Sequence, residues 1–190
     1  MTNLLSIWYT SLIYWEDGSL CLCIDFHGFN HISKKDCYLL PLISDLLDLP
    51  HKARVYTKIN LCYVYHLVYI ANSDKWKTTF RTHYRSFKWF VMPFDLTNTS
   101  TVFQQFINDL FSDLLDICIM IYLDNILIYS NNMSKHCWHV KKVLKYLYKT
   151  GLYTKVEKCK FHFKLVEYLG YILSLSSFTM SDDKLKIIQD

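Results

Sequence analysis

Alanine, arginine, glycine and proline are scarce in this chain. Its 190 residues include only 2 Ala, 3 Arg, 4 Gly and 3 Pro. These four residue types have codons rich in G and C, whereas the abundant Lys, Asn, Ile, Tyr and Phe have A+T-rich codons, so the composition indicates an A+T-biased gene. No Gly- or Pro-rich linker, internal repeat or low-complexity segment separates domains. We therefore expect a single domain over residues 1–190.

The seven cysteines do not have the spacing of a metal site or a disulfide framework. No CxxC pair occurs, and Cys21 and Cys23 are too close together for an ordinary disulfide. Reduced thiols in the cytosol or nucleus are the favoured interpretation. The apolar segment 4–15 lacks a basic flank and a cleavage site, and is shorter than the ~20 residues that span a membrane. We expect no membrane partner, and a secreted or anchored protein is the less favoured alternative.

Apolar residues make up 52% of the chain and charged residues 20%, which is typical of a folded globular domain. The formal net charge of +4 is mild. A small lysine excess permits nucleic-acid binding, but a solvated surface is the commoner explanation. Charge alone therefore indicates no partner.

Apolar periodicity predicts an α+β fold, an antiparallel sheet covered by helices on one face. Strands are predicted over residues 12–15, 20–24, 55–61, 76–82, 87–92, 160–163 and 168–173, with a turn at Asp17-Gly18-Ser19. Helices are predicted over residues 40–49, 98–115 and 134–150, and a further one starts at 182. Pro50 ends the first, Thr97 or Asn98 caps the second, and Gly151 closes the third.

The segment 117–130 is the most informative part of the chain. Two apolar runs rich in β-branched residues flank Asp124 and Asn125. This pattern predicts a β-hairpin that holds a carboxylate at its tip. Considered alone, an Asp-Asn pair between strands is more often a simple turn.

Further motifs surround this hairpin in a definite order. They include Asp17-Gly18-Ser19-Leu20, Tyr56-Thr57-Lys58-Ile59-Asn60, Trp76-Lys77-Thr78, Val91-Met92-Pro93-Phe94, Phe103-Gln104, Tyr122-Leu123-Asp124, Glu157-Lys158-Cys159 and Tyr168-Leu169-Gly170-Tyr171-Ile172. In this order and spacing, from about residue 11 to residue 190, the chain resembles the reverse transcriptase of gypsy-class long-terminal-repeat retrotransposons. The resemblance implies a right-hand polymerase palm with part of the fingers. It places the thumb, ribonuclease H and integrase regions outside the chain.

The resemblance also implies a catalytic centre with Mg²⁺ as cofactor. The family holds the metal with three carboxylates, whose positions here are Asn60, Asp124 and Asn125. Only Asp124 keeps a carboxylate, so it is the one metal ligand carried over with its charge. An amide oxygen can touch Mg²⁺ but brings no charge. We expect weakened metal binding and a catalytic rate lowered by roughly a thousandfold or more.

The same resemblance implies a site for the incoming deoxynucleotide. Its substrate-binding positions are Tyr65, Phe94 and Asp95, the last standing where the family has glycine. Basic residues that the family uses to hold phosphate are replaced in this chain. The replacing residues are Trp15, Glu16, Cys21 and His27. An RNA or DNA template-primer is the implied macromolecular partner, and the oligomeric state is not indicated.

Many of the replacements share a mutational pattern. Arg→Cys, Arg→His, Asp→Asn and Gly→Asp each require one C-to-T or G-to-A change, so our hypothesis is a degenerate element copy. Catalysis would then be absent or very weak. The alternatives are a non-catalytic nucleic-acid-binding remnant, a pseudogene product without a selected role, and an enzyme rescued by partner subunits.

Two features of the predicted helix 134–150 leave alternatives open. His136 and His139 lie one turn apart and could suggest zinc, but no second ligand pair is at hand and the family often has histidine at both positions. Lysines recur along the same helix at positions 141, 142, 145 and 149. They form either a solvated face or a contact to a template.

Overall fold

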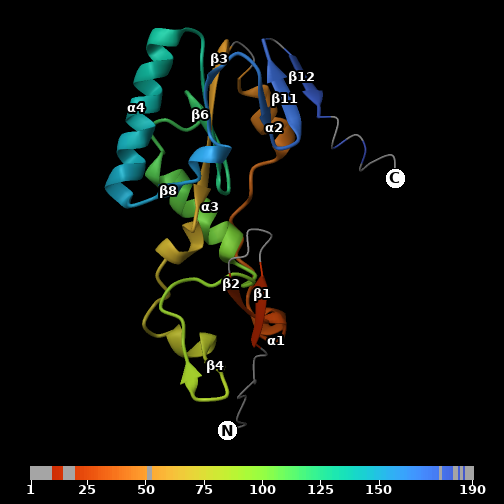
Figure 1. The fold of residues 1–190 in the computed structure, drawn as a ribbon, viewed down its shortest axis with the longest axis vertical. Coiled ribbons are helices and arrows are strands. Elements are labelled where there is room, and N and C mark those ends of the chain that lie inside the picture. The colour runs from red at the N-terminus through yellow and green to blue at the C-terminus, as the bar shows by residue number, and fades with distance from the viewer. Residues whose placement is uncertain are drawn as a thin grey trace. The chain divides into compact units, whose positions relative to one another are not determined.

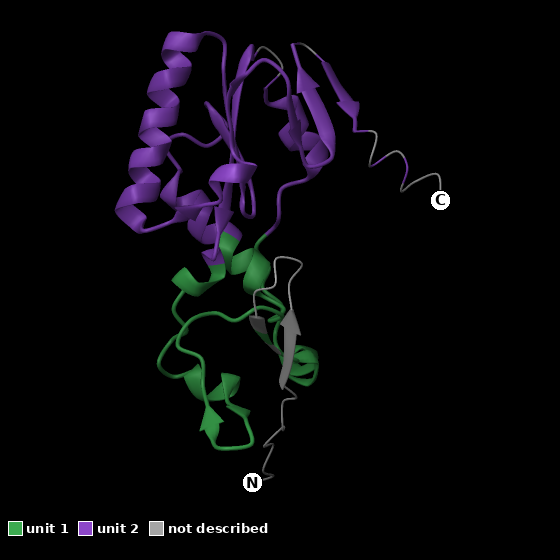
Figure 2. Cartoon of the chain, viewed as in Figure 1, with its two compact units in different colours: residues 1–38, 65–103 green, residues 39–64, 104–190 purple. Residues whose placement is uncertain are grey.

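The computed structural model describes residues 10–14, 20–50, 53–175, 177–181, 184 and 186. It contains two compact units, which Figure 2 distinguishes by colour. Unit 1 comprises residues 1–38 and 65–103, and unit 2 comprises residues 39–64 and 104–190. Some predictions fall outside the described residues. These are the turn at residues 17–19, the helix start at 182, the positions Trp15 and Glu16, and the side chain of Cys21.

Unit 2 is built on a five-stranded sheet with β3 (Val55–Cys62) at its centre (Figure 1). On one side β3 pairs with β7, which pairs with β6, and on the other side it pairs with β8 and β9. All these pairings are antiparallel. The partner strands are β6 (Ile119–Tyr122), β7 (Asn125–Ser130), β8 (Tyr153–Thr154) and β9 (Lys160–Phe163).

One face of this sheet is covered by α4 (Met133–Thr150) and by the part of α3 (Thr99–Leu110) that belongs to unit 2. α4 packs against β7 and β3, and α3 contacts β6 through the buried side chain of Gln104. Asn132 caps α4 by accepting a hydrogen bond from the Lys135 amide, and Gly151 ends it at φ 68°. The predicted α+β architecture is therefore confirmed.

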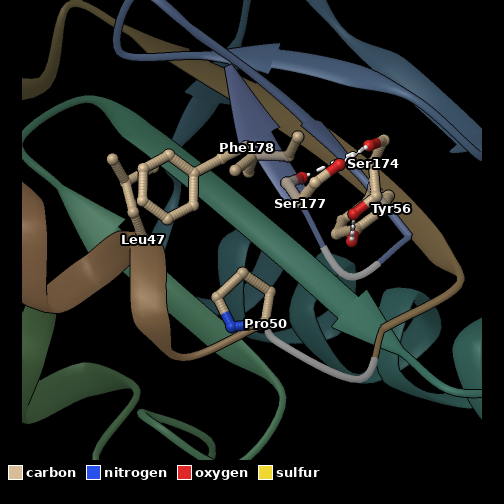
Figure 3. A pocket seen from close by; sticks show the side chains of 7 residues that line it. Leu47, Pro50, Tyr56, Ser174, Ser177 and Phe178 are labelled. Carbon is tan, nitrogen blue, oxygen red and sulfur yellow. Dashed lines mark hydrogen bonds between the residues drawn. The ribbon is translucent and has the colours of Figure 1, made fainter. Parts of the chain in front are cut away.

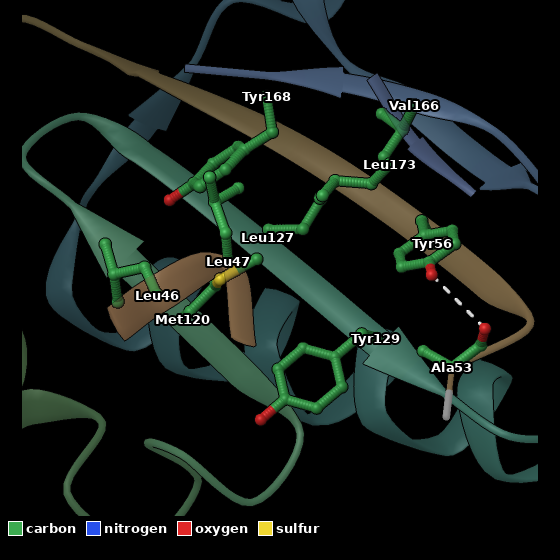
Figure 4. Packing of buried hydrophobic residues seen from close by; sticks show 10 residues of the cluster. All are labelled: Leu46, Leu47, Ala53, Tyr56, Met120, Leu127, Tyr129, Val166, Tyr168 and Leu173. Carbon is green, nitrogen blue, oxygen red and sulfur yellow. Dashed lines mark hydrogen bonds between the residues drawn. The ribbon is translucent and has the colours of Figure 1, made fainter. Parts of the chain in front are cut away.

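The opposite face packs against α2 (Ile43–Asp48) and a small sheet made of β10 (Val166–Tyr168), β11 (Tyr171–Ser174) and β12 (Ser177–Met180). Figure 4 shows this core, to which β3 contributes Tyr56, β6 contributes Met120, and β7 contributes its alternate residues Leu127 and Tyr129. Burying each large apolar side chain contributes about 1.5–3 kcal/mol. The cluster contains Leu46, Leu47, Ala53, Tyr56, Met120, Leu127, Tyr129, Val166, Tyr168 and Leu173.

This core leaves little empty space. A pocket beside Leu47, Pro50 and Phe178 has a volume of about 10 Å³, roughly the space of one water molecule (Figure 3). The Tyr56 hydroxyl at its wall already contacts the carbonyl oxygens of Ala53 and Ser174, each at 3.2 Å. The pocket is a packing defect and is too small for a ligand.

Unit 1 consists of short elements around its own small core. The antiparallel pair β1 (Thr10–Tyr14) and β2 (Leu20–Ile24) is followed by α1 (His27–Ile32). Two short 3₁₀ turns, η1 (Val64–Leu67) and η2 (Lys75–Thr78), precede the two-residue strands β4 (Phe80–Arg81) and β5 (Ser86–Phe87). The buried core residues are Ile24, Phe26 and Phe80.

Several predicted boundaries were wrong for local reasons. The helix expected over 40–49 begins only at Ile43, since Pro41 disfavours helical geometry in the residue before it. The hairpin expected over 76–92 keeps only β4 and β5, because Trp76 lies in a 3₁₀ turn. The strand expected over 168–173 is a hairpin that turns at Leu169 and Gly170, both with positive φ.

One of the two side chains expected to cap α3, that of Asn98, makes its hydrogen bonds elsewhere. The side chain of Asn98 accepts a hydrogen bond from the Asp36 amide and donates one to the Lys34 carbonyl oxygen. It is therefore committed to the loop before α2 and does not cap α3. Among the described residues, no helix is long and apolar enough to cross a membrane.

Candidate active site

The tip of the β6–β7 hairpin is a two-residue turn formed by Leu123 and Asp124. The predicted carboxylate at the tip is confirmed, whereas Asn125 is already the first residue of β7 and pairs with Tyr122. Leu123 has a φ of 52°, a conformation uncommon for a residue with a branched side chain. This backbone persists because the surrounding contacts determine it.

Asn60 lies on β3 directly opposite Asn125. The structure therefore brings together all three positions predicted for the catalytic centre, although they are up to 65 residues apart in sequence. The Nδ2 atom of Asn60 donates to Asn125 Oδ1 at 2.8 Å and makes a longer contact of 3.5 Å to Asp124 Oδ2. The Nδ2 atom of Asn125 donates to Asp124 Oδ1 at 3.1 Å.

These contacts form an amide clamp, by which we mean Asn60 and Asn125 holding the carboxylate of Asp124. A carboxylate can only accept hydrogen bonds, so the NH₂ group of each amide must point toward it. Both carboxylate oxygens thus face amide donors. All three side chains are only partly buried, so water reaches the clamp.

Three further groups fix the tip of the hairpin. The fully buried Gln104 accepts from the Leu123 amide at 2.7 Å and donates to the Ile121 carbonyl oxygen at 3.2 Å. The Leu61 amide donates to the Asp124 carbonyl oxygen at 2.8 Å. From β10, the buried Tyr168 hydroxyl donates to the Asn125 carbonyl oxygen at 3.1 Å, and burial raises the pKa of this hydroxyl.

The role of Gln104 gives a stability prediction. Gln104→Leu should lower the free energy of unfolding by roughly 1–3 kcal/mol, because the partly buried Leu123 amide would lose its acceptor. Urea unfolding followed by circular dichroism measures this loss. Gln105→Leu is the matched control, since Gln105 is an exposed neighbour on the same helix. Equal stability of the two variants would show that Gln104 does not hold the tip.

The charge balance around the clamp bears on whether it can hold a metal ion. Lys58 precedes Asn60 by two residues and faces the same side of β3. Burial lowers the pKa of Lys58, with smaller opposing contributions that include the carboxylates of Glu167 and Asp124. Asp124 is the one carboxylate of the clamp itself, and the nearby Lys58 partly offsets its negative charge.

Mg²⁺ binds to proteins through near-octahedral oxygen ligands anchored by anionic carboxylates. The clamp offers a single carboxylate, and amide NH₂ groups already occupy its oxygens. Within the described residues, no group of three or more His, Cys, Asp or Glu side chains has the geometry for a metal ion. The donor set at this site does not fit Mg²⁺.

The predicted substrate-binding residues gather within unit 1. The ring of Tyr65 packs edge-on against Phe94 and Phe103, with centroids 5.6 Å and 5.5 Å away. Asp95 follows Phe94 at a φ of 71°, a conformation that favours glycine. Its carboxylate accepts from the Phe26 amide at 3.2 Å. A glycine at this position would relieve the backbone, which agrees with the glycine expected from the resemblance.

Unit 1 also contains an open hollow of about 1130 Å³. Its wall includes the aromatic rings of Phe29 and Trp76 and the basic side chains of Lys34, Lys77 and Arg81. Asp74 also lines it and forms an ion pair with Lys77 at 2.7 Å, so Lys34 and Arg81 are the basic residues of the wall without that ion pair. Rings and cations together suit a ligand that carries both flat bases and phosphates. The sequence patterns did not indicate this hollow, because its lining comes from segments distant in sequence.

The helix α4 contributes a buried polar network that the sequence did not predict. His136 is fully buried, with Nε2 at 2.7 Å from Thr57 Oγ1 and Nδ1 at 3.0 Å from Ser130 Oγ. The same Ser130 oxygen lies 2.7 Å from His139 Nδ1. Burial lowers the pKa of His136 to about 4. Both histidines are thus engaged by hydroxyl groups, which explains them without zinc.

Comparisons with known proteins decide the family. A family model described as "Reverse transcriptase (RNA-dependent DNA polymerase)" matches residues 19–173. The chain belongs to the reverse transcriptase family. Its relatives include the Transposon Tf2-7 and Tf2-3 polyproteins of Schizosaccharomyces pombe, which are 34% and 33% identical over 175 residues. These alignments cover 92% of this chain and 13% of each polyprotein.

Solved reverse transcriptases confirm the fold. The foamy viral protease-reverse transcriptase in complex with an RNA/DNA hybrid matches with a TM-score of 0.81 and 18% identity, covering 97% of this chain and 25% of that chain. The same viral protein in complex with double-stranded DNA matches with a TM-score of 0.85 and 18% identity, covering 97% of this chain and 32% of that chain. The predicted α+β polymerase palm is therefore confirmed for this reverse transcriptase.

Proposed function

We propose that this reverse transcriptase domain derives from a gypsy-class long-terminal-repeat retrotransposon and has lost its metal-dependent catalysis. Its ancestral reaction is DNA synthesis on an RNA or DNA template from deoxynucleotides. The observation that carries the proposal is the amide clamp, in which Asn60 and Asn125 donate hydrogen bonds to Asp124. At two of the three positions that anchor metal in the family, a carboxylate that would repel Asp124 is thereby replaced by a neutral amide that donates a hydrogen bond to it.

The loss can be expressed as a rate. Replacing two of three carboxylates by amides reduces the formal charge at the tip from three negative charges to one. A bound metal ion supplies several kcal/mol of charge stabilisation to a displacement at phosphorus. Losing even about 4 kcal/mol of it slows the reaction roughly a thousandfold. Weak residual synthesis at this level is the upper limit that we expect.

The alternative function is a nucleic-acid-binding remnant without catalysis. The hollow in unit 1 favours it over an inert product, because its basic and aromatic lining suits a template strand. Asp124 would then have lost its role in catalysis, and Tyr65 and Phe94 their role in binding the deoxynucleotide, while template binding would persist.

A primer-extension assay tests the proposed loss of catalysis. The unaltered chain should incorporate no nucleotide above background on a primed RNA template. Asn60→Asp combined with Asn125→Asp should restore measurable extension if these two positions alone limit the reaction. An Asp124→Asn change in the restored background serves as the inactive control. Synthesis by the unaltered chain that Asp124→Asn abolishes would overturn the proposal.

An inactive double variant would also be informative. A second group of replacements concerns the substrate site and not the metal site. It comprises Asp95, His27 and the residues at positions 15, 16 and 21. If the double variant binds metal but extends no primer, these replacements are sufficient to block synthesis. The proposal that catalysis is lost then stands, with a second cause.

A further inference from the structure

The exposed face of α4 is unusually basic. Its 18 residues contain five lysines, and the helix has no aspartate or glutamate. At 100° per residue, three of these lysines and two aromatic residues fall within roughly a third of the helix circumference. We call this set the α4 face, and its members are Trp138, Lys141, Lys145, Tyr148 and Lys149.

The charges of this face are not balanced within the described residues. Lys142 at its border forms an ion pair with Asp113 at 2.7 Å, but no ion pair is found there for Lys141, Lys145 or Lys149. These three lysines follow one another at intervals of four residues, so neighbouring like charges oppose the helix. If this face served only as a solvated surface, a mixture of positive and negative side chains would make the helix more stable. The uniform charge of the face indicates an external anion.

Aromatic residues accompany these charges. Trp138 is 59% exposed and Tyr148 is 88% exposed. The Nζ atom of Lys142 lies 5.3 Å from the centre of the Trp138 ring, so the indole is held beside a cation. Val140, Val143 and Leu147 form the buried side of α4 against the sheet, whereas Leu144 beside the α4 face is 41% exposed. The exposed rings are therefore not a by-product of core packing.

We propose that the α4 face binds a segment of single-stranded nucleic acid, separately from the polymerase centre. Evenly spaced lysines can follow a chain of phosphates, and exposed aromatic rings can stack on bases. An anionic membrane fits less well, because an interfacial helix needs a wide apolar side for insertion, and most aliphatic residues of α4 (Val140, Val143 and Leu147) are buried against the sheet. An acidic protein would use the lysines but would not need the exposed indole.

This site does not depend on the proposed loss of catalysis. It uses no residue of the amide clamp and requires no metal ion. Failure of primer extension therefore leaves it untouched, and binding to a labelled oligonucleotide tests it alone. The Trp138 ring supplies a second, independent readout through stacking.

The test is fluorescence anisotropy of a labelled single-stranded oligonucleotide over a range of salt concentrations. Changing Lys141, Lys145 and Lys149 together to Gln should weaken binding at least about tenfold at low salt and reduce the salt slope by about 2, since each phosphate contact contributes about 0.7. Trp138→Ala should weaken binding roughly tenfold with little change in that slope. Both changes lie on the exposed surface, and circular dichroism confirms the fold.

The control removes the same charge elsewhere in unit 2. Lys158, Lys160 and Lys164 are exposed, and changing all three to Gln should leave the affinity within about twofold. Equal losses in both triple variants would mean that net charge alone governs binding and would overturn the proposal. A second result would also overturn the proposal. If the α4-face variants still bind the oligonucleotide but no longer bind phosphatidylserine vesicles, the face is a lipid site.

Discussion

Restoring the lost carboxylates should make the protein less stable in the absence of metal. The Asn60→Asp/Asn125→Asp variant replaces two hydrogen-bond donors with charges that repel Asp124. Charge-assisted hydrogen bonds are each worth about 1.5–3 kcal/mol, and the site is partly solvated, so we expect a loss of roughly 2–4 kcal/mol. For a chain of this length the melting temperature should fall by about 10 °C.

Mg²⁺ should reverse this loss in the variant and have no effect on the unaltered chain. A ligand that binds only the folded state stabilises it by about 2.7 kcal/mol at a hundredfold excess over Kd. Thermal unfolding with and without millimolar Mg²⁺ measures the difference. Asn72→Asp/Asn131→Asp is the matched control, because both asparagines are exposed and lie away from the clamp. Loss of stability without a response to Mg²⁺ would mean that three carboxylates here do not make a metal site.

Acid should destabilise the protein through His136. The pKa of this buried histidine falls from 6.5 to about 4 on folding, so the folded state favours the neutral ring. The neutral His136 therefore contributes its full stabilisation of the fold above pH 6.5, the pKa of the histidine in the unfolded chain. This contribution is lost as the pH falls from 6.5 toward 4. The full contribution is about 3 kcal/mol, of which about 2 kcal/mol is lost by roughly pH 5.

The geometry explains why the charged ring is disfavoured. Ser130 Oγ contacts a ring nitrogen of both His136 and His139, and Thr57 Oγ1 also accepts from the His162 amide. A neutral ring offers one donor and one acceptor to these hydroxyls, whereas a charged ring offers two donors and enters an apolar interior. Burial also lowers the pKa of His139, so protonation of His139 in acid further reduces the stability of the folded state.

His136→Gln isolates this contribution. Glutamine does not titrate, so the difference in unfolding free energy between the parent and this variant should shrink by about 2 kcal/mol between neutral pH and about pH 5. His83→Gln is the control, because His83 is exposed. Urea titrations at several pH values give the measurement. A constant difference across that range would exclude His136 as the acid-sensitive group.

The sequence predicted those parts of the fold that depend on local signals. The strand that became β3 has β-branched residues at regular spacing, and α4 ends at Gly151, which takes the positive φ that glycine tolerates. The pairing of Asn60 with Asn125 followed from the family resemblance. No local pattern would have placed them together, since they lie on different strands.

The parts that were missed depend on contacts between distant segments. Gln104 belongs to a motif of the family resemblance, but its role in holding the hairpin tip became visible only through its hydrogen bonds to Ile121 and Leu123. The Tyr168 hydroxyl is equally undetectable from sequence, because tyrosine in a strand is usually explained by packing. The hollow of unit 1 is assembled from α1, η2, β4, β5 and the segments between them, which are distant in sequence. Positions of this kind require the tertiary structure.

The central claim is that the amide clamp around Asp124 excludes a divalent metal ion. Electron paramagnetic resonance of Mn²⁺ tests it most directly, because free Mn²⁺ gives a sharp signal that binding removes. With the unaltered chain at millimolar concentrations we expect the full free-ion signal, and with the Asn60→Asp/Asn125→Asp variant we expect its loss. A signal lost with the unaltered chain and regained with Asp124→Asn would contradict the account.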